Sequence, residues 1–214
     1  NDKIVPYFWS DEEVTNFLNS AQEEAVIRGR LILDSYTQNP DFVIEVNKGS
    51  PVYDILELLY EISHIWFVDQ GRQLSEGCKL ELRSTELMDR TMSANWREVE
   101  GEPRFIAQAD KWLRVAPIPQ RDGFLMLEGY RRPVKMDLAL AETVGPEINE
   151  AHHEHLVQWA LYKAFSIPDA EGFDPERSQL AKAEFTNYFG LRPDSDLRRI
   201  TREDVPHHVE AFWP

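Results

Sequence analysis

The chain has 214 residues and a mass of 25.0 kDa, the size of one large domain or two small ones. Its 38 acidic and 23 basic residues give a formal net charge of −15, which argues against a protein that wraps nucleic acid through clustered Lys and Arg. With 42% hydrophobic residues the chain can build a packed core, so disorder over its whole length is excluded. The single cysteine, Cys78, excludes an intrachain disulfide. No apolar run approaches the length of a membrane span and the first residues lack a signal-peptide pattern, so we expect a soluble globular protein.

The first predicted element is a helix that begins at Ser10. Ser10 followed three residues later by Glu13 is a capping box, in which each side chain satisfies a free backbone N–H of the first turn. Apolar residues then recur at helical spacing, namely Val14, Phe17, Leu18, Ala21 and Ala25. The pattern predicts a helix that continues to about Ser35, with Gly29 as a weak point.

The hydrophobic pattern changes to that of strands from Phe42 onward. Lys79 to Arg83 alternates strictly between polar and apolar residues, as expected of a half-buried strand. A hairpin is predicted from Arg104 to Val115, followed by a strand from Phe124 to Tyr130. Helices return at Pro146, ending near Ser166, and again from Asp174 to Gly190.

This order of elements predicts an α+β fold in which N- and C-terminal helices form a long-helix bundle and a β-rich, antiparallel sheet insertion lies between them. The expected parts are an N-terminal helical part at 1–41, the β-rich insertion at 42–140, C-terminal helices at 141–190 that complete the bundle, and an extended docking tail at 191–214. Acidic residues are concentrated on the flanking helices, whereas the later β segment is nearly neutral.

A group of histidines in the helix after Pro146 is the strongest candidate for metal binding. His152 and His155 lie three residues apart, share a helical face and could in principle approach one metal ion. The spacing differs from that of the helical metalloprotease motif, which has two histidines four residues apart beside a general-base Glu. Because His155 shares its stripe with Trp159, we prefer packed, structural histidines and expect no metal site. A metal-dependent hydrolase is the less favoured alternative.

No catalytic motif is present, since the sequence lacks G-x-S-x-G, P-loop and G-x-G-x-x-G patterns. We therefore expect no enzyme, no catalytic residues and no cofactor. Basic residues gather late in the β-rich segment and in the tail, at Arg114, Arg121, Arg131, Arg132, Lys135, Arg198, Arg199 and Arg202. Given the overall acidity, a surface that docks an acidic protein or a solvated face is preferred here over a nucleic-acid patch.

Aromatic residues offer two further hypotheses. Trp66, Trp96 and Trp112, if exposed side by side, would favour a tail or baseplate module that binds a ligand such as a sugar. The tail ends in Phe212, Trp213 and Pro214, and apolar aromatics at such a position either fold back or insert into a neighbour as binding anchors. His207 and His208 lie in the same proline-flanked tail, for which a solvated or partner-docked state is preferred over a ligand set.

Short sequence motifs distributed along residues 8–190 form a further pattern. They are Phe8 to Glu13, Leu18 to Ala25, Val46 with Gly49, Pro51 and Tyr53, Leu87 with Asp89, Asn95 with Trp96, Gly101 with Pro103, Pro117 and Pro119 before Gly123, Tyr130 to Pro133, and Pro146 to Ile148 with His155, Leu156 and Trp159 to Leu161. In these motifs and in its order of segments, the chain resembles the head–tail connector (adaptor) proteins of tailed bacteriophages.

The resemblance implies a non-catalytic structural protein of the virion. Copies would form a twelvefold ring beneath the portal protein, with a tail or neck protein on the opposite face and genomic DNA passing through the channel without sequence-specific binding. The docking tail, with Val205, Phe212, Trp213 and Pro214, would reach into the portal. The implied location is the virion neck at the head–tail junction, after synthesis in the host bacterial cytoplasm.

Overall fold

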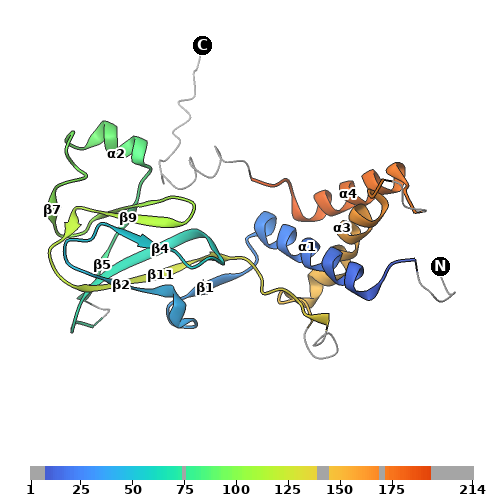
Figure 1. The fold of residues 1–214 in the computed structure, drawn as a ribbon, viewed down its shortest axis with the longest axis horizontal. Helices are drawn as coiled ribbons and strands as arrows, with labels where there is room; N and C mark the ends of the chain where they lie inside the picture. The colour runs from blue at the N-terminus through green and yellow to red at the C-terminus, as the bar shows by residue number, and fades with distance from the viewer. Residues whose placement is uncertain (1–7, 74–75, 139–144, 169–171, 194–214) are drawn as a thin grey trace, which may run out of the picture. The chain divides into compact units, whose positions relative to one another are not determined.

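The computed structural model describes residues 8–73, 76–138, 145–168 and 172–193 (Figure 1). They form two compact units, one built from residues 8–33 and 130–192 and the other mainly from residues 34–129. Among the described residues the fold is mixed α/β with four α-helices and several sheets, and is 35% helical and 27% strand. The expected long-helix bundle with a single β insertion is therefore wrong.

The helical unit contains three of the four α-helices. They are α1 (Asp11–Gly29), α3 (His153–Phe165), which follows the 3-10 turn η4 (Glu150–His152), and α4 (Pro175–Phe189). Figure 1 shows these helices packed against one another. Aromatic rings fill the space between α3 and α4, with the centroids of Trp159 and Phe185 4.8 Å apart and those of Phe185 and Phe189 4.6 Å apart.

Helix α1 begins as predicted and ends earlier than predicted. The Ser10–Glu13 capping box is confirmed, since the Glu13 N–H donates to Ser10 Oγ and the Ser10 N–H donates to Glu13 Oε2. At the other end the helix stops at Gly29, and Arg30 adopts a left-handed conformation with φ 50°. The continuation to Ser35 was wrong because Leu33–Ser35 forms strand β1, which pairs with a strand distant in sequence.

The β unit is built from two main sheets. The first contains β1 (Leu33–Ser35), β2 (Val43–Val46), β4 (Leu59–Asp69), β5 (Cys78–Lys79) and β11 (Gly123–Arg131). The second has the order β3 (Val52–Asp54), β9 (Trp112–Ala116), β8 (Phe105–Gln108) and β6 (Glu81–Leu82). A third, two-stranded sheet pairs β7 (Glu100–Gly101) with β10 (Ile118–Pro119) in parallel, and the short elements η1 (Pro40–Phe42) and α2 (Thr85–Thr91) complete the unit.

One core cluster joins the two main sheets. Strands of the first sheet contribute side chains such as Ile65 and Leu125, and strands of the second contribute Ile106 and Leu113. All four of these side chains are fully buried. Burial of a Leu or Ile side chain contributes roughly 1.5–3 kcal/mol, so this shared core is the main stabilising element of the β unit.

The strand predicted from Lys79 to Arg83 is divided between the two sheets. Lys79 pairs with Trp66 in the first sheet, whereas Glu81 pairs in parallel with Phe105 in the second. Between them, the buried Leu80 donates its N–H to the Ile65 carbonyl at 2.9 Å. The alternation is real, but it marks a crossing point between sheets and not one continuous strand.

The predicted hairpin is confirmed by β8 and β9, which pair antiparallel with Phe105 opposite Ala116. The predicted helix from Asp174 to Gly190 is confirmed by α4, whose N-cap Asp174 accepts from the Arg177 N–H. Among the helices in the described part of the chain, none has both the length and the apolar character needed to cross a membrane.

Candidate functional site

The histidines near the start of α3 contact the aromatic side chains of α4. Nδ1 of His152 lies 3.1 Å from the Tyr188 hydroxyl, and the ring of His155 stacks on that of Tyr188 with centroids 3.4 Å apart. Both imidazoles also approach Phe189. Within the described ranges, no three His, Cys, Asp or Glu side chains are grouped so that they could hold a metal ion. The contacts support the structural interpretation of His152 and His155.

The basic residues of the late β segment are divided between the two units. Arg114 and Arg121 belong to the β unit, whereas Arg131, Arg132 and Lys135 belong to the helical unit. Three of the arginines are paired with carboxylates, namely Arg121 with Asp69 and Glu102, Arg131 with Glu147, and Arg132 with Glu23. Local ion pairing of this kind does not favour a nucleic-acid surface. The tail residues Arg198, Arg199 and Arg202 lie outside the described residues.

The three tryptophans considered for ligand binding are not side by side on one surface. Trp96 is only 1% exposed and belongs to a small core cluster with Met88. Trp66 lies on β4 of the first sheet, where it stacks on His64. Trp112 lies on β9 of the second sheet and is 37% exposed. The burial of Trp96 counts against the sugar-binding module.

Trp96 is held in place by a charged cluster at the surface of the β unit. Its indole Nε1–H donates to Asp89 Oδ1 at 2.8 Å, and the Arg97 guanidinium lies 4.3 Å from the centre of the Trp96 ring. Arg97 also donates to both carboxylate oxygens of Asp89, at 2.5 and 3.1 Å. These hydrogen bonds, first from Arg97 and then from Trp96, lower the pKa of Asp89 to about 2.

The Asp89 interaction is expected to give the β unit a pH-dependent stability. Because the pKa of Asp89 falls from 3.8 in its unperturbed state to about 2 in the fold, the stabilisation is fully present above pH 3.8 and is lost as the pH falls through about 2. Urea unfolding between pH 5 and 2 will measure this. Asp89→Asn should show a smaller loss of stability over that interval than the wild-type chain. Equal losses of stability in the two proteins would mean that the fold does not lower the pKa of Asp89.

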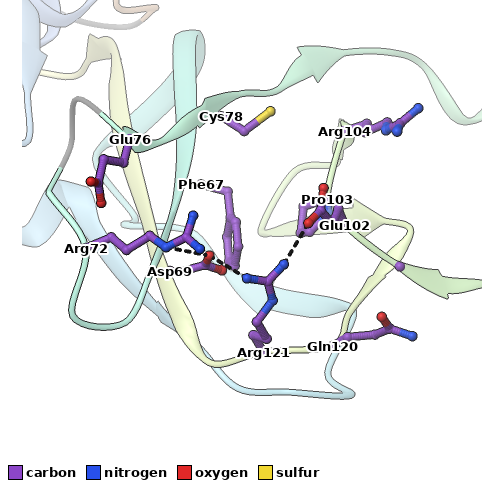
Figure 2. Close-up of a pocket in the computed structure, with 11 residues that line it drawn as sticks. Phe67, Asp69, Arg72, Glu76, Cys78, Glu102, Pro103, Arg104, Gln120 and Arg121 are labelled. Atoms are coloured by element: carbon purple, nitrogen blue, oxygen red, sulfur yellow. Dashed lines mark hydrogen bonds and ion pairs between the residues drawn. The ribbon is translucent and has the colours of Figure 1, made fainter.

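A cavity of about 170 Å³ lies in the β unit (Figure 2). The buried ring of Phe67 lines it, and ion pairs link several of the charged side chains around it. Arg121 donates to Asp69 Oδ2 at 2.8 Å and to Glu102 Oε1 at 2.7 Å. The exposed thiol of Cys78 also lies at this cavity. Its lining residues come from well-separated segments, so no local sequence signal predicted it.

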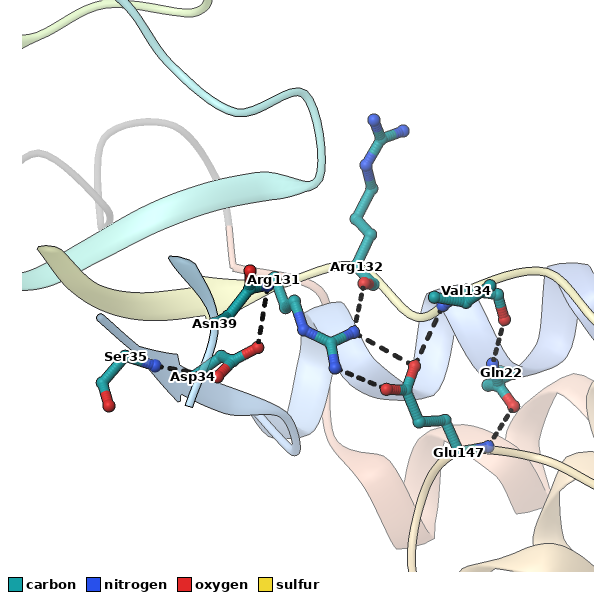
Figure 3. Close-up of polar contacts among 8 residues, drawn as sticks. All are labelled: Gln22, Asp34, Ser35, Asn39, Arg131, Arg132, Val134 and Glu147. Atoms are coloured by element: carbon teal, nitrogen blue, oxygen red, sulfur yellow. Dashed lines mark hydrogen bonds and ion pairs between the residues drawn. The ribbon is translucent and has the colours of Figure 1, made fainter. Parts of the chain in front are cut away.

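An extended segment after β11 is bound by polar side chains of the helical unit (Figure 3). Asn19 of α1 forms two hydrogen bonds with the backbone of Met136, accepting from its N–H at 2.7 Å and donating to its carbonyl at 3.0 Å. Gln22 donates to the Val134 carbonyl at 3.3 Å, and Glu147 accepts from the Val134 N–H at 3.0 Å. Gln22 also accepts from the Glu147 N–H at 2.9 Å, which joins the three side chains in one network.

This network, which we call the α1 clamp (Asn19, Gln22 and Glu147), was missed by the sequence reasoning. The available signal was a pair of amide side chains three residues apart on α1, next to the apolar stripe. Gln22 is fully buried, and a buried amide needs hydrogen-bond partners. Those partners come from more than 100 residues further along the chain, so the sequence could not identify them.

The residues predicted to dock on the portal, Val205, Phe212, Trp213 and Pro214, lie outside the described residues, as do His207 and His208. Their role stays a prediction.

The chain matches the model of the SU10 adaptor protein family over residues 1–209 and belongs to that family. The resemblance to phage adaptors is thus confirmed at the level of the family, which gives the chain a structural role as a virion component associated with other virion proteins. A search of curated proteins finds no match.

Proposed function

We propose that the protein is a head–tail connector whose copies form a twelvefold ring between the portal protein and a tail or neck protein. The observation that carries this proposal is the family match over residues 1–209, which spans both units and most of the tail. The role is structural and not catalytic, and its place is the neck of the virion.

The charge of the chain supports a channel through which genomic DNA passes. A net charge of −15 repels DNA phosphates, so an acidic lining lets the genome slide without sequence-specific binding. Exposed acidic residues occur on the first turn of α1, at Asp11, Glu12 and Glu13. We propose that the face lining the channel is net negative, and a channel dominated by Arg and Lys would contradict this.

Single-particle cryo-electron microscopy of the chain incubated with its portal protein tests the proposal. We expect a closed ring of twelve copies stacked on the narrow face of the portal. The same map would show which surfaces line the channel and where residues 191–214 lie. An intact portal without bound chain would overturn the connector role in favour of a tail or baseplate module.

Removal of residues 205–214 is expected to weaken portal binding by at least about 30-fold, because buried aromatic anchors such as Phe212 and Trp213 each typically contribute 2 kcal/mol or more. Co-sedimentation of the chain with portal particles measures the affinity. The double variant His207→Ala/His208→Ala is the control, since it changes the same tail and keeps both aromatic residues. Unchanged binding of the truncated chain would show that the tail does not dock on the portal.

A further inference from the structure

The segment held by the α1 clamp has one backbone edge that faces away from the clamp. Val134 and Met136 direct their backbone polar groups toward the clamp. Two residues of a strand span about 6.6 Å, which is close to the distance between side chains three residues apart on a helix. Asn19 and Gln22 can therefore bind Val134 and Met136 with hydrogen bonds like those that the backbone of a neighbouring strand would form. Alternation then turns the N–H and C=O of Lys135 outward, and in the described ranges neither group has a hydrogen-bond partner.

Strand β3 offers a second open edge, on the β unit. It is the terminal strand of its sheet and pairs only with β9 there. The Val115 N–H bonds to the Pro51 carbonyl and the Ile55 N–H to the Lys111 carbonyl, so residues 51, 53 and 55 face β9. The backbone groups of Val52 and Asp54 therefore point to the free edge. Both side chains are exposed, and the described part of the chain provides no partner for these backbone groups.

We infer that the Lys135 edge of one copy pairs with the β3 edge of the next copy, as an antiparallel strand addition in which Lys135 lies opposite Asp54. In that register the two residues exchange both backbone hydrogen bonds, and the ammonium group faces the carboxylate across the strands. This inference rests on the proposed ring, for which it supplies a contact between copies.

The charges on the two edges favour this pairing. Charged residues on short edge strands normally prevent pairing with other chains. Two β3 edges repel each other where Asp54 faces Asp54, and two Lys135 edges repel each other where Lys135 faces Lys135. Lys135 facing Asp54 is an attractive pair. A contact between two different surfaces runs head to tail, and such contacts build closed rings when the rotation between copies closes.

The acidity of the chain makes this local complementarity more significant. With a net charge of −15, most surfaces of two copies repel each other. Lys135 is an exposed cation in the helical unit. Backbone hydrogen bonds together with a Lys–Asp pair therefore provide a contact that acidic copies can make.

Carbodiimide cross-linking tests the pairing directly, because this reagent joins an amine to a carboxylate only when the two are in contact. Chains labelled with ¹⁴N and ¹⁵N are mixed, concentrated alone or bound to portal particles, cross-linked and digested for mass spectrometry. We expect a linked peptide pair containing Lys135 and Asp54 with one isotope on each side. Absence of this mixed pair in both samples, or a link found only within single copies, overturns the inference.

Charge reversal provides the second test. Lys135→Glu and Asp54→Lys should each weaken association between copies by about fivefold or more, and the double variant should recover most of the loss. Lys48→Glu and Asp110→Lys are matched controls at exposed positions and should have little effect. Sedimentation velocity of the free chain and particle images of the portal-bound chain measure the association. Equal effects of the Lys135 and Lys48 variants, or no recovery in the double variant, would contradict the pairing.

The proposed function and this inference fail in different ways. Binding of the wild-type chain to the portal is measured by co-sedimentation, without reference to contacts between copies. A chain that binds the portal as a ring and lacks the Lys135–Asp54 link refutes the inference alone. A chain that forms the link in solution and never binds the portal refutes the connector role alone.

Discussion

Replacement of Arg28 by alanine is expected to destabilise the helical unit by about 3 kcal/mol, because it removes the shorter of the two ion pairs of the largely buried Glu24 carboxylate and leaves only the contact with Arg192 at 3.4 Å. The Arg28 side chain is 6% exposed, and its Nε lies 2.8 Å from Glu24 Oε1. Its Nη1 donates to Thr186 Oγ1 at 3.0 Å and to the Gly190 carbonyl at 2.9 Å, which ties α1 to the end of α4. The guanidinium also lies 5.0 Å from the centre of the Trp159 ring.

Hydrogen exchange of the α1 and α4 amides measures this effect within the helical unit, independently of the β unit. Arg177→Ala is the matched control, because Arg177 pairs with Asp174 on α4 and its side chain is 70% exposed. We expect the control to cost less than about 1 kcal/mol, as is usual for a surface pair. Similar losses of protection in the two variants would show that Arg28 does not connect the helices.

Replacement of Trp96 by alanine is expected to destabilise the β unit by about 3–5 kcal/mol, the range found when a large buried aromatic side chain is removed from a core. The Trp96 ring packs with Met88 of α2 and with Ala107 and Ala116 of the second sheet. Its loss also leaves Asp89 without one of its hydrogen-bond donors. We therefore expect α2 to detach before the rest of the β unit unfolds.

Urea unfolding and limited proteolysis around residues 85–99 together measure this change. Trp112→Ala is the control, since Trp112 is a tryptophan of the same unit with a partly exposed side chain. We expect a clearly smaller loss in the control and no new cleavage near α2. A Trp96 variant as stable and as protease-resistant as the control would contradict the assigned role of the small core.

The fold could be predicted from the sequence where one segment contained all the interacting groups. The capping box needed only Ser10 and Glu13, and the N-cap of α4 needed only Asp174 and the first turn that it caps. The hairpin of β8 and β9 likewise pairs residues close in sequence. The packing of His152 and His155 was expected because His155 shares the stripe of Trp159 and His152 lies on the same helical face, although only the structure identified Tyr188 and Phe189 as their partners.

Where the partner is distant in sequence, prediction failed. Leu33–Ser35 forms a strand because β11, almost 100 residues further on, is available to pair with it. Lys79 to Arg83 is divided because Leu80 enters the core between two sheets that are both built from remote segments. For the same reason a single β insertion was expected where the chain forms several sheets.

By itself the sequence determined the acidity, the starts of α1 and α4, the hairpin and the resemblance to phage adaptors, since these depend on composition, on contacts within one segment or on the order of short sequence motifs. The helix predicted from Pro146 begins later, at His153. Only the tertiary structure decided which backbone edges have no partner among the described residues. The α1 clamp occupies one side of the segment around Lys135, and β9 occupies one side of β3. Whether an N–H or C=O is free depends on every strand and side chain that packs beside it, and this is a property of the folded chain.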